Sequence, residues 1–261
     1  MKLLGMTVVV TGGASGMGES MCHALAKEGA SIVVADKNKD GADIVASELN
    51  ASGIKAISVK ADVQAREELE AMANVAFETF GKINVLVNNA GARVIKSFLD
   101  HTKDDWDMML GINLSGPFHC SQAIVPKMIE SGGGSIINVC SIASYMGRPN
   151  RCAYVAAKSG LLGLTRTMAM DLAPKNIRVN GISPGMIASP FNRRFAEDTE
   201  MGSAWEDDNL VGRWGTPADI DGAVVFLASR ESSFITGSDI KVEGGWLSAR
   251  ARAGEEAVTS D

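Results

Sequence analysis

Cysteine and histidine are scarce in this sequence, and their spacing excludes the common metal and redox motifs. The 261 residues contain four cysteines and three histidines, and no two cysteines are separated by two residues. We interpret Cys22, Cys120, Cys140 and Cys152 as small apolar side chains in a reducing compartment. The sequence therefore favours a cytoplasmic protein without a metal site.

Long apolar runs and an excess of positive charge are also absent. No apolar run reaches the roughly 18 residues that a bilayer-spanning helix needs. The net charge of −6 argues against nucleic acid or an anionic membrane as the main partner. Residues 1–4 lead directly into a β-branched run, so we interpret them as part of the mature protein and not as a leader.

The sequence does contain a regular alternation of short β-branched runs and longer amphipathic stretches. Expected strands cover residues 6–10, 31–35, 56–59, 85–88, 135–139, 178–182 and 239–242. Expected helices cover residues 16–28, 41–52, 65–80, 105–130, with a break near Gly116 and Pro117, 154–172 and 217–229. Strands that are apolar throughout are typical of a parallel sheet covered on both faces. We expect an α/β fold, a Rossmann-type doubly wound parallel sheet of about seven strands with helices on both faces.

A glycine-rich segment, TGGASGMG from Thr11, lies between the first expected strand and the first expected helix. At such a junction the backbone turns tightly, approaches a pyrophosphate closely and then offers the N–H groups of a helix start. A purely structural turn is the alternative, because glycine turns are common. The position of the segment favours a dinucleotide cofactor held by Gly12, Ser15, Gly16, Met17 and Gly18.

Asp36 follows the second expected strand, eighteen residues after Gly18. A carboxylate at this place accepts hydrogen bonds from the adenosine ribose and repels a 2′-phosphate, which favours NAD over NADP. Ser15, in place of a basic residue in the loop, favours NAD as well, whereas Lys37 could attract the phosphate. Capping of the helix that begins near Lys39 is the alternative role for Asp36.

Tyr154 and Lys158 open an expected helix, where a spacing of four residues places both side chains on one face. A phenol is a poor base at its ordinary pKa near 10. A cation about 4 Å away in a partly buried site contributes on the order of 4 kcal/mol, which would bring the phenol pKa toward about 7. A tyrosine in that range is a competent general acid/base. The pair alone is common, and the phosphate loop earlier in the chain is what makes it informative.

Ser141 follows the expected strand 135–139 and should lie just beyond its carboxyl end. In open α/β sheets ligands bind at that edge. Ser144 is a rival three residues later, with an alternative role as a turn or cap residue.

In chain order these features resemble the classical short-chain dehydrogenase/reductase family from Leu4 to about Trp246. The remaining matching motifs are Asp62-Val63, Asn88-Asn89-Ala90-Gly91, Asn113, Pro184-Gly185, Gly212-Arg213-Trp214-Gly215-Thr216-Pro217 and Glu243-Gly244-Gly245. Each motif is modest evidence, and the ordered set is specific. Together with Asp36, the resemblance implies an NAD-dependent oxidoreductase that transfers a hydride between nicotinamide and a secondary alcohol or ketone.

The resemblance also implies a role for each position. Tyr154 would pass a proton, Ser141 would hydrogen-bond the substrate oxygen, and Lys158 would hold the nicotinamide ribose and tune Tyr154. Asn113 would position a water in a proton relay to Lys158. The family's usual spacing of thirteen residues before Tyr154 favours Ser141 over Ser144. Further cofactor contacts would come from Asp62, Val63, Asn89, Ala90, Gly91, Pro184, Gly185, Ile187 and Ser189.

Two positions depart from the family pattern. Ser189 stands where members commonly have a threonine, and because the hydroxyl is kept we expect cofactor binding to survive. Cys140 stands where a serine often precedes the catalytic serine, which puts an oxidisable thiol close to the site.

No linker or repeat divides the chain, so we expect a single dinucleotide-binding catalytic domain over residues 1–247. Within it, residues 187–211 show no strand pattern, and we expect them to form a lid. Its Phe191, Phe195, Met201 and Trp205 would enclose an apolar substrate or, alternatively, pack the lid on the body. We expect specificity to depend also on residues 93–97 and 143–150. Residues 248–261 are small, polar and charged, and we expect a flexible tail.

Charged residues of the expected lid favour two opposite predictions about the charge of the substrate. Its acidic residues form a solvated face or, as a second hypothesis, disfavour a bulky anion such as an acyl-CoA at the entrance, and they are Glu197, Asp198, Glu200, Glu206, Asp207 and Asp208. Arg193 and Arg194, in contrast, could hold a carboxylate.

Two other functions stay open beside NAD-linked alcohol oxidation or ketone reduction. One is an NADPH-dependent ketone or 3-oxoacyl reductase, against which Asp36 and Ser15 count. The other is a non-catalytic nucleotide-sensing protein on the same fold, against which the intact serine, tyrosine and lysine count. The resemblance further implies a homotetramer, or a homodimer, assembled through helices 105–130 and 154–172 and through the C-terminal region.

Overall fold

The computed structural model describes residues 1–192, 195, 206 and 209–248. Several lid residues named above lie outside the described residues, as does the expected tail from residue 249 onward. They are Arg193, Arg194, Glu197, Asp198, Glu200, Met201, Trp205, Asp207 and Asp208.

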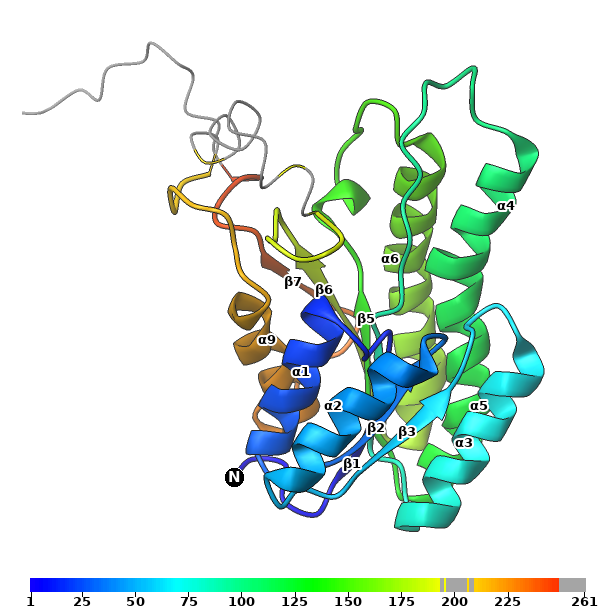
Figure 1. Cartoon of the computed structure of the whole chain (residues 1–261), viewed down its shortest axis with the longest axis vertical. Coiled ribbons are helices and arrows are strands. Elements are labelled where there is room, and N and C mark those ends of the chain that lie inside the picture. The colour runs from blue at the N-terminus through cyan, green and yellow to red at the C-terminus, as the bar shows by residue number, and fades with distance from the viewer. Residues whose placement is uncertain (193–194, 196–205, 207–208, 249–261) are drawn as a thin grey trace, which may run out of the picture.

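Seven parallel strands form one sheet in the order β3-β2-β1-β4-β5-β6-β7 (Figure 1). The strands are β1 (Thr7–Thr11), β2 (Ser31–Asp36), β3 (Ala56–Lys60), β4 (Val85–Asn88), β5 (Gly134–Val139), β6 (Ile177–Pro184) and β7 (Asp239–Val242). The order reverses between β1 and β4, which pair with Thr11 opposite Asn88. In an open α/β sheet this switch point is where ligands bind. The expected doubly wound, single-domain fold is confirmed.

Helices cover both faces of the sheet (Figure 1). One face carries α1 (Gly16–Lys27), α2 (Lys39–Ala51) and α9 (Ala218–Ala228), and the other carries α3 (Arg66–Phe80), α4 (Lys103–Leu110), α5 (Gly116–Glu130) and α6 (Cys152–Leu172). Val8 and Val10 join the core under α1, whereas Val9 between them joins the core under α3 and α5. Successive strand residues point to opposite faces, so a strand with a core on each side must be apolar throughout.

The helix expected over residues 105–130 is not broken near Gly116. A π-helix, Gly111–Ser115, joins α4 to α5 without an interruption. Pro117 lies in the first turn of α5, and its missing N–H is accommodated by the wider turn just before it. Gly116 and Pro117 correctly marked the position of an irregularity in the helix. The irregularity is a π-helical turn that widens the helix and does not end it.

Other boundaries moved by one or two residues. β1 extends to Thr11, α2 begins at Lys39 and α6 begins at Cys152. Residues 2–5 form turns, and the Leu3 side chain is fully buried in the core. In the part of the chain that the structure describes, no helix has the length and apolarity that crossing a bilayer demands.

Candidate active site

A pocket lies where β1, β4, β5 and β6 end, on the edge that carries the switch point. Every residue that the sequence analysis assigned to the site lines this pocket. They are Gly12, Ser15, Gly16, Met17, Gly18, Asp36, Asp62, Val63, Asn89, Ala90, Gly91, Asn113, Ser141, Tyr154, Lys158, Pro184, Gly185, Ile187 and Ser189. The topology therefore brings together residues that are up to 177 positions apart, from Gly12 to Ser189.

The glycine loop leads from β1 into α1 in a backbone form that strongly favours glycine. Gly12 and Gly16 have φ of 65° and 59°, in the left-handed region. A Cβ on Gly18 would lie 1.9 Å from the carbonyl oxygen of Gly12, so the first turn of α1 is packed directly on the loop. Ser15 stands at the helix N-cap without a side-chain capping bond. The loop and helix start thus form a cradle that fits a pyrophosphate.

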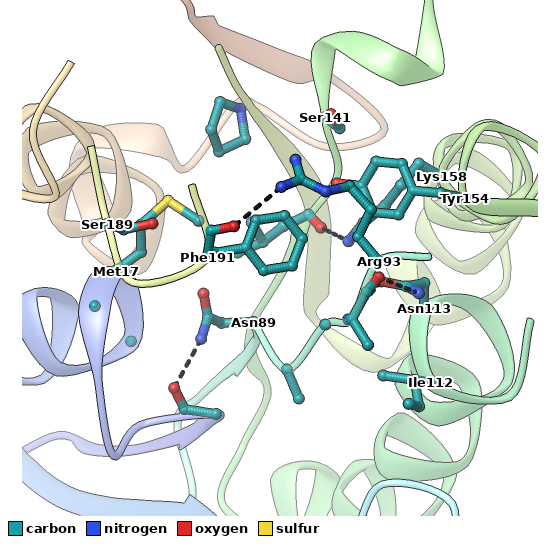
Figure 2. Close-up of a pocket in the computed structure, with 18 of the residues that line it drawn as sticks. Met17, Asn89, Arg93, Ile112, Asn113, Ser141, Tyr154, Lys158, Ser189 and Phe191 are labelled. Atoms are coloured by element: carbon teal, nitrogen blue, oxygen red, sulfur yellow. Dashed lines mark hydrogen bonds between the residues drawn. The ribbon is translucent and has the colours of Figure 1, made fainter. Parts of the chain in front are cut away.

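Asn89 holds the glycine loop against the end of β4. Its Nδ2 donates hydrogen bonds of 3.0 Å to the carbonyl oxygens of Thr11 and Gly12 (Figure 2). The Thr11 hydroxyl in turn accepts from the N–H groups of Asn89 and Ala90. These bonds fix the cradle to the neighbouring strand, which is what a rigid cofactor site requires.

Asp36 lies at the end of β2 and faces the same pocket. Its carboxylate accepts hydrogen bonds from the N–H groups of Ala14, at 3.1 Å, and Asn38, at 2.9 Å. The helix cap of α2 is Asn38, whose side chain accepts from Gly41, so the alternative capping role belongs to Asn38. Lys37 also lines the pocket.

Asp62 and Val63 follow β3, the strand next to β2, and line the same end of the pocket as Asp36. The Asp62 carboxylate accepts from the N–H of Gln64 at 2.9 Å, which holds the turn toward the pocket. Val63 is almost fully buried, and a Cβ on Gly116 would lie 2.9 Å from its Cγ2. The start of α5 therefore packs directly on Val63.

Ser141 begins a short 3₁₀ turn, Ile142–Ser144, just after β5. Its Oγ accepts a hydrogen bond of 3.1 Å from the N–H of Ala143, and its hydroxyl lowers the pKa of the Tyr154 phenol. Ser144 donates instead to the backbone carbonyl of Lys158 at 2.9 Å. Ser144 thus ties the turn to α6, and Ser141 is the serine beside the phenol.

Tyr154 and Lys158 lie one helical turn apart on α6, as their spacing predicted, but their electrostatics differ from the expectation (Figure 2). Burial raises the pKa of Tyr154, and the Ser141 hydroxyl and the charge of Arg93 only partly oppose this effect. The Lys158 Nζ lies 6.0 Å from the centre of the Tyr154 ring and donates to the Val139 carbonyl at 2.6 Å. The ammonium is thus directed at β5, and burial is the largest influence on the pKa of the phenol.

Lys158 itself is 4% exposed, and burial lowers its pKa to about 8. Cys140, at 2% exposure, packs beside it, and burial raises the pKa of that thiol to about 12. The thiol therefore stays protonated at neutral pH, which opposes the oxidation that its position suggested.

Asn113 lies in the π-helix and is fully buried. Its Nδ2 donates to the carbonyls of Met109 and Ala92, both at 3.0 Å, and its Oδ1 accepts from the Ala92 N–H. One side chain thus holds the loop after β4 against the helix (Figure 2). π-turns of this kind are frequent at functional sites.

The segment after β6 closes the pocket over the glycine loop. A Cβ on Gly16 would lie 3.3 Å from Pro190 and 3.6 Å from the Ser189 Cβ. Ile187 forms a parallel bridge with Gly215, and its carbonyl accepts from the Asn192 side chain at 2.9 Å. The described start of the expected lid is therefore anchored on both sides.

Sequence reasoning missed several residues that line the pocket, among them Met186, Asn192 and Arg151. The sequence did contain a signal for Arg151, because it is a basic residue only three positions before the expected general acid, Tyr154. Asn192 had none, because its partner Arg93 is 99 residues away and only the fold joins them.

Comparisons with known proteins agree with this geometry. A family model described as enoyl-(acyl carrier protein) reductase matches residues 12–247. The 3-oxoacyl-[acyl-carrier-protein] reductase FabG of Thermotoga maritima is 35% identical over 245 residues, 94% of this chain and 99% of the relative. The 2-dehydro-3-deoxy-D-gluconate 5-dehydrogenase of Escherichia coli is 37% identical over 247 residues, 94% of this chain and 97% of the relative.

A solved structure resembles this chain in both fold and sequence. A gluconate 5-dehydrogenase from Burkholderia cenocepacia, crystallised in complex with NADP and tartrate, superposes with a TM-score of 0.92 at 34% identity. The match covers 95% of this chain and 97% of that chain. The chain belongs to the classical short-chain dehydrogenase/reductase family. It is an oxidoreductase that acts on hydroxyl or ketone groups of a small molecule with a nicotinamide cofactor.

Proposed function

We propose that this protein is an NAD-dependent dehydrogenase/reductase of secondary alcohols and ketones, with Tyr154 as the general acid/base. One observation carries the proposal. Ser141 and Tyr154 line one pocket at the sheet edge together with the glycine cradle, and the Ser141 hydroxyl acts on the phenol by lowering its pKa. Two hydroxyls held together in this way bind one substrate oxygen and leave one proton to transfer.

The cradle at Gly12 and Gly18 fits the cofactor, since the absence of side chains lets the loop, the first turn of α1 and the end of β4 pack closely enough to present backbone N–H groups. When bound, a nicotinamide accepts or supplies the hydride. In ketone reduction the carbonyl carbon gains that hydride and the carbonyl oxygen takes the proton of the Tyr154 phenol, and in alcohol oxidation both return, the hydroxyl proton to the Tyr154 phenolate. Because burial raises the Tyr154 pKa, the phenol is protonated at neutral pH and ready to act as the acid.

Lys158 and Asn113 have supporting roles in the proposal. Lys158 is held at the pocket by its bond to Val139 and would hydrogen-bond the ribose. Pro117 lacks the N–H that an α-helix would direct at the Asn113 carbonyl. This carbonyl is therefore suited to hold the water of a proton relay toward Lys158.

NAD as the preferred cofactor rests on Asp36. Its carboxylate faces the adenosine end of the pocket and is fixed there by two backbone N–H groups. A fixed carboxylate accepts from ribose hydroxyls and repels a 2′-phosphate. Lys37 lines the pocket as well and favours the alternative, an NADPH-dependent ketone or 3-oxoacyl reductase. The NADP of the Burkholderia enzyme and the activity of the Thermotoga relative support that second candidate.

The experiment that tests the proposal uses the only two tyrosines in the chain. Wild type, Tyr154→Phe and Tyr145→Phe are mixed with NAD or NADP and a panel of secondary alcohols, while reduced-nicotinamide absorbance is followed. Tyr145 is the matched control, because its hydroxyl bonds Asp239 and it is absent from the pocket lining. We expect turnover with NAD that Tyr154→Phe lowers at least about a hundredfold and Tyr145→Phe leaves intact.

Other results would redirect the proposal. Turnover that survives in Tyr154→Phe would exclude this tyrosine as the acid/base. Preference for NADP would favour the second candidate. Binding of NADH without turnover of any alcohol or ketone would favour the nucleotide-sensing alternative.

We also propose a homotetramer, or a homodimer, assembled through α4, α5 and α6. Large apolar side chains on these helices are exposed to solvent in the single chain, and they include Trp106, Met108, Phe118 and Met170. Burial of such side chains is a common driving force for association. Light scattering that gave the mass of a monomer at micromolar concentration would refute this assembly.

A further inference from the structure

Phe191 lies beside the proposed general acid, and the proposed function assigns it no role. Its ring centre is 6.4 Å from that of Tyr154 and the two ring planes are inclined by 42°, which is within the range of an aromatic pair (Figure 2). Both side chains line the same pocket. Because the hydroxyl of Tyr154 is rigidly attached to its ring, a contact on the ring determines where the proton of the phenol is directed.

The backbone that carries Phe191 is fixed on the side of the glycine loop. Phe191 is 40% exposed, and a ring that is only partly buried keeps one orientation where neighbouring groups hold it. The N–H of Asn192 donates to the carbonyl of Ser189 at 2.8 Å, which closes a turn around Phe191. Ser189 in turn packs on the glycine loop, where a Cβ on Gly16 would lie 3.6 Å from the Ser189 Cβ. One end of the turn is therefore anchored at the cofactor cradle.

Arg93, from the loop after β4, holds Phe191 from the other side. Its guanidinium carbon lies 4.5 Å from the centre of the Phe191 ring, and its Nη2 donates to the Phe191 carbonyl at 3.0 Å (Figure 2). Its Nη1 donates to Asn192 Oδ1 at 2.9 Å, and the Asn192 Nδ2 donates to the Ile187 carbonyl at 2.9 Å. One planar guanidinium thus contacts the ring, its backbone and the next side chain together, which a lysine ammonium does not reproduce.

We propose that Arg93 and Asn192 are positioning residues that hold the Phe191 ring against the Tyr154 ring and thereby orient the phenol for proton transfer. Arg93 and Phe191 are 98 positions apart, so their contact joins the loop after β4 to the segment after β6 across the pocket. A phenol that is held less firmly meets the substrate oxygen less often in the reactive geometry, which lowers kcat. This inference rests on the proposed function and adds the residues that position its general acid.

A fluorine probe tests the ring contact without any substrate. The chain has two tyrosines, so 3-fluorotyrosine incorporated into the Tyr145→Phe protein gives a fluorine resonance from Tyr154 alone. The position of that resonance depends on the aromatic ring next to it. We expect Phe191→Leu and Arg93→Met each to shift it. Where Phe191 is already replaced by leucine, Arg93→Met should shift it much less, because Arg93 acts through the ring.

Kinetics separate the hold of Arg93 from its charge. Burial raises the pKa of Tyr154 and the charge of Arg93 partly opposes that rise, so Arg93→Lys keeps a charge and loses the planar contacts. With a substrate of the alcohol panel, we expect Arg93→Lys and Arg93→Met both to lower kcat at least about fivefold. The Kd of NADH should change less than about twofold, because the cradle and Asp36 are untouched. Asn192→Ala should lower kcat in the same direction.

Arg66→Met is the matched control, because Arg66 is exposed, pairs with Glu70 and lies outside the pocket lining. It should leave the fluorine resonance and kcat unchanged. An unshifted resonance in Arg93→Met would overturn the inference, as would an equal shift in the Phe191→Leu background or a wild-type kcat in Arg93→Lys. Failure of wild type to bind NADH, or activity in Tyr154→Phe, would instead contradict the proposed function, and the fluorine measurement would still report on the ring contact.

Discussion

The ammonium of Lys158 donates a hydrogen bond of 2.6 Å to the carbonyl oxygen of Val139, the last residue of β5. This bond joins the helix of the proposed general acid to the strand that leads into Ser141. The arrangement buries the positive charge of Lys158, and this burial lowers the pKa of the ammonium to about 8. The residue is therefore held in place at the expense of stability, a pattern common at functional sites.

Replacing Lys158 with Met should stabilise the protein while removing activity. The pKa falls from 10.5 to about 8, which corresponds to a destabilisation on the order of 3 kcal/mol at neutral pH. Loss of the bond to Val139 offsets part of this gain, so we expect about 1–2 kcal/mol more stability. Chemical denaturation at pH 7 measures the difference, and a less stable variant would contradict the burial argument.

The same residue sets a pH dependence of stability. Between pH 8 and 10.5 the unfolded chain keeps the Lys158 proton and the folded chain has lost it. Unfolding then binds a proton, so the contribution of this group to stability rises with pH across that window. The stability of wild type relative to Lys158→Met should therefore increase from pH 8 to 10. Parallel curves for the two proteins would show that Lys158 titrates normally.

Gly18→Ala should damage the cofactor cradle. The new Cβ would lie 1.9 Å from the Gly12 carbonyl, which forces the loop and α1 apart. We expect a loss of at least about 2 kcal/mol in stability and much weaker NADH binding. Gly163→Ala is the control, because it is also helical, is exposed and meets nothing within 4 Å. It should instead stabilise α6 by up to about 1 kcal/mol. Fluorescence titration with NADH and thermal melts compare the two.

Asp36→Ala should lower the ratio of NAD to NADP efficiency at least about tenfold, because the ribose acceptor and the repulsive charge both disappear. Asp40→Ala removes an exposed carboxylate nearby on α2 that does not line the pocket. Steady-state kcat/KM with both cofactors measures the ratio. An equal ratio in wild type and Asp36→Ala would remove the basis for NAD preference.

Asn113→Ala should impair both stability and turnover. The change removes the partners of the Ala92 N–H and carbonyl, at about 2–3 kcal/mol, and frees the loop at the pocket. Asn50→Ala is the control, since Asn50 pins the Ala56 backbone by two bonds outside this site. Both variants should melt earlier, and only Asn113→Ala should lower kcat. Equal kcat in the two would make Asn113 a structural residue alone.

Local patterns were enough to predict the sheet and the glycine loop. Val8, Val9 and Val10 are all apolar because β1 packs on both faces, and this signal is present in adjacent residues. Gly12 and Gly16 signal a left-handed backbone turn that other residues adopt only rarely. Gly18 signals a helix start packed so closely on the loop that a side chain would clash. Tyr154 and Lys158 lie one helical turn apart, so their proximity follows from helix geometry.

Contacts between distant segments and the effects of burial had no such signal. The bond from Arg93 to Asn192, the hold of Asn113 on Ala92 and the direction of the Lys158 ammonium all depend on how packed elements meet. The pKa of Tyr154 shows the difference most clearly. Spacing alone predicts a cation that lowers it, whereas burial raises it. Residue order defines which groups are local neighbours, but desolvation and long-range contacts exist only once the chain has folded.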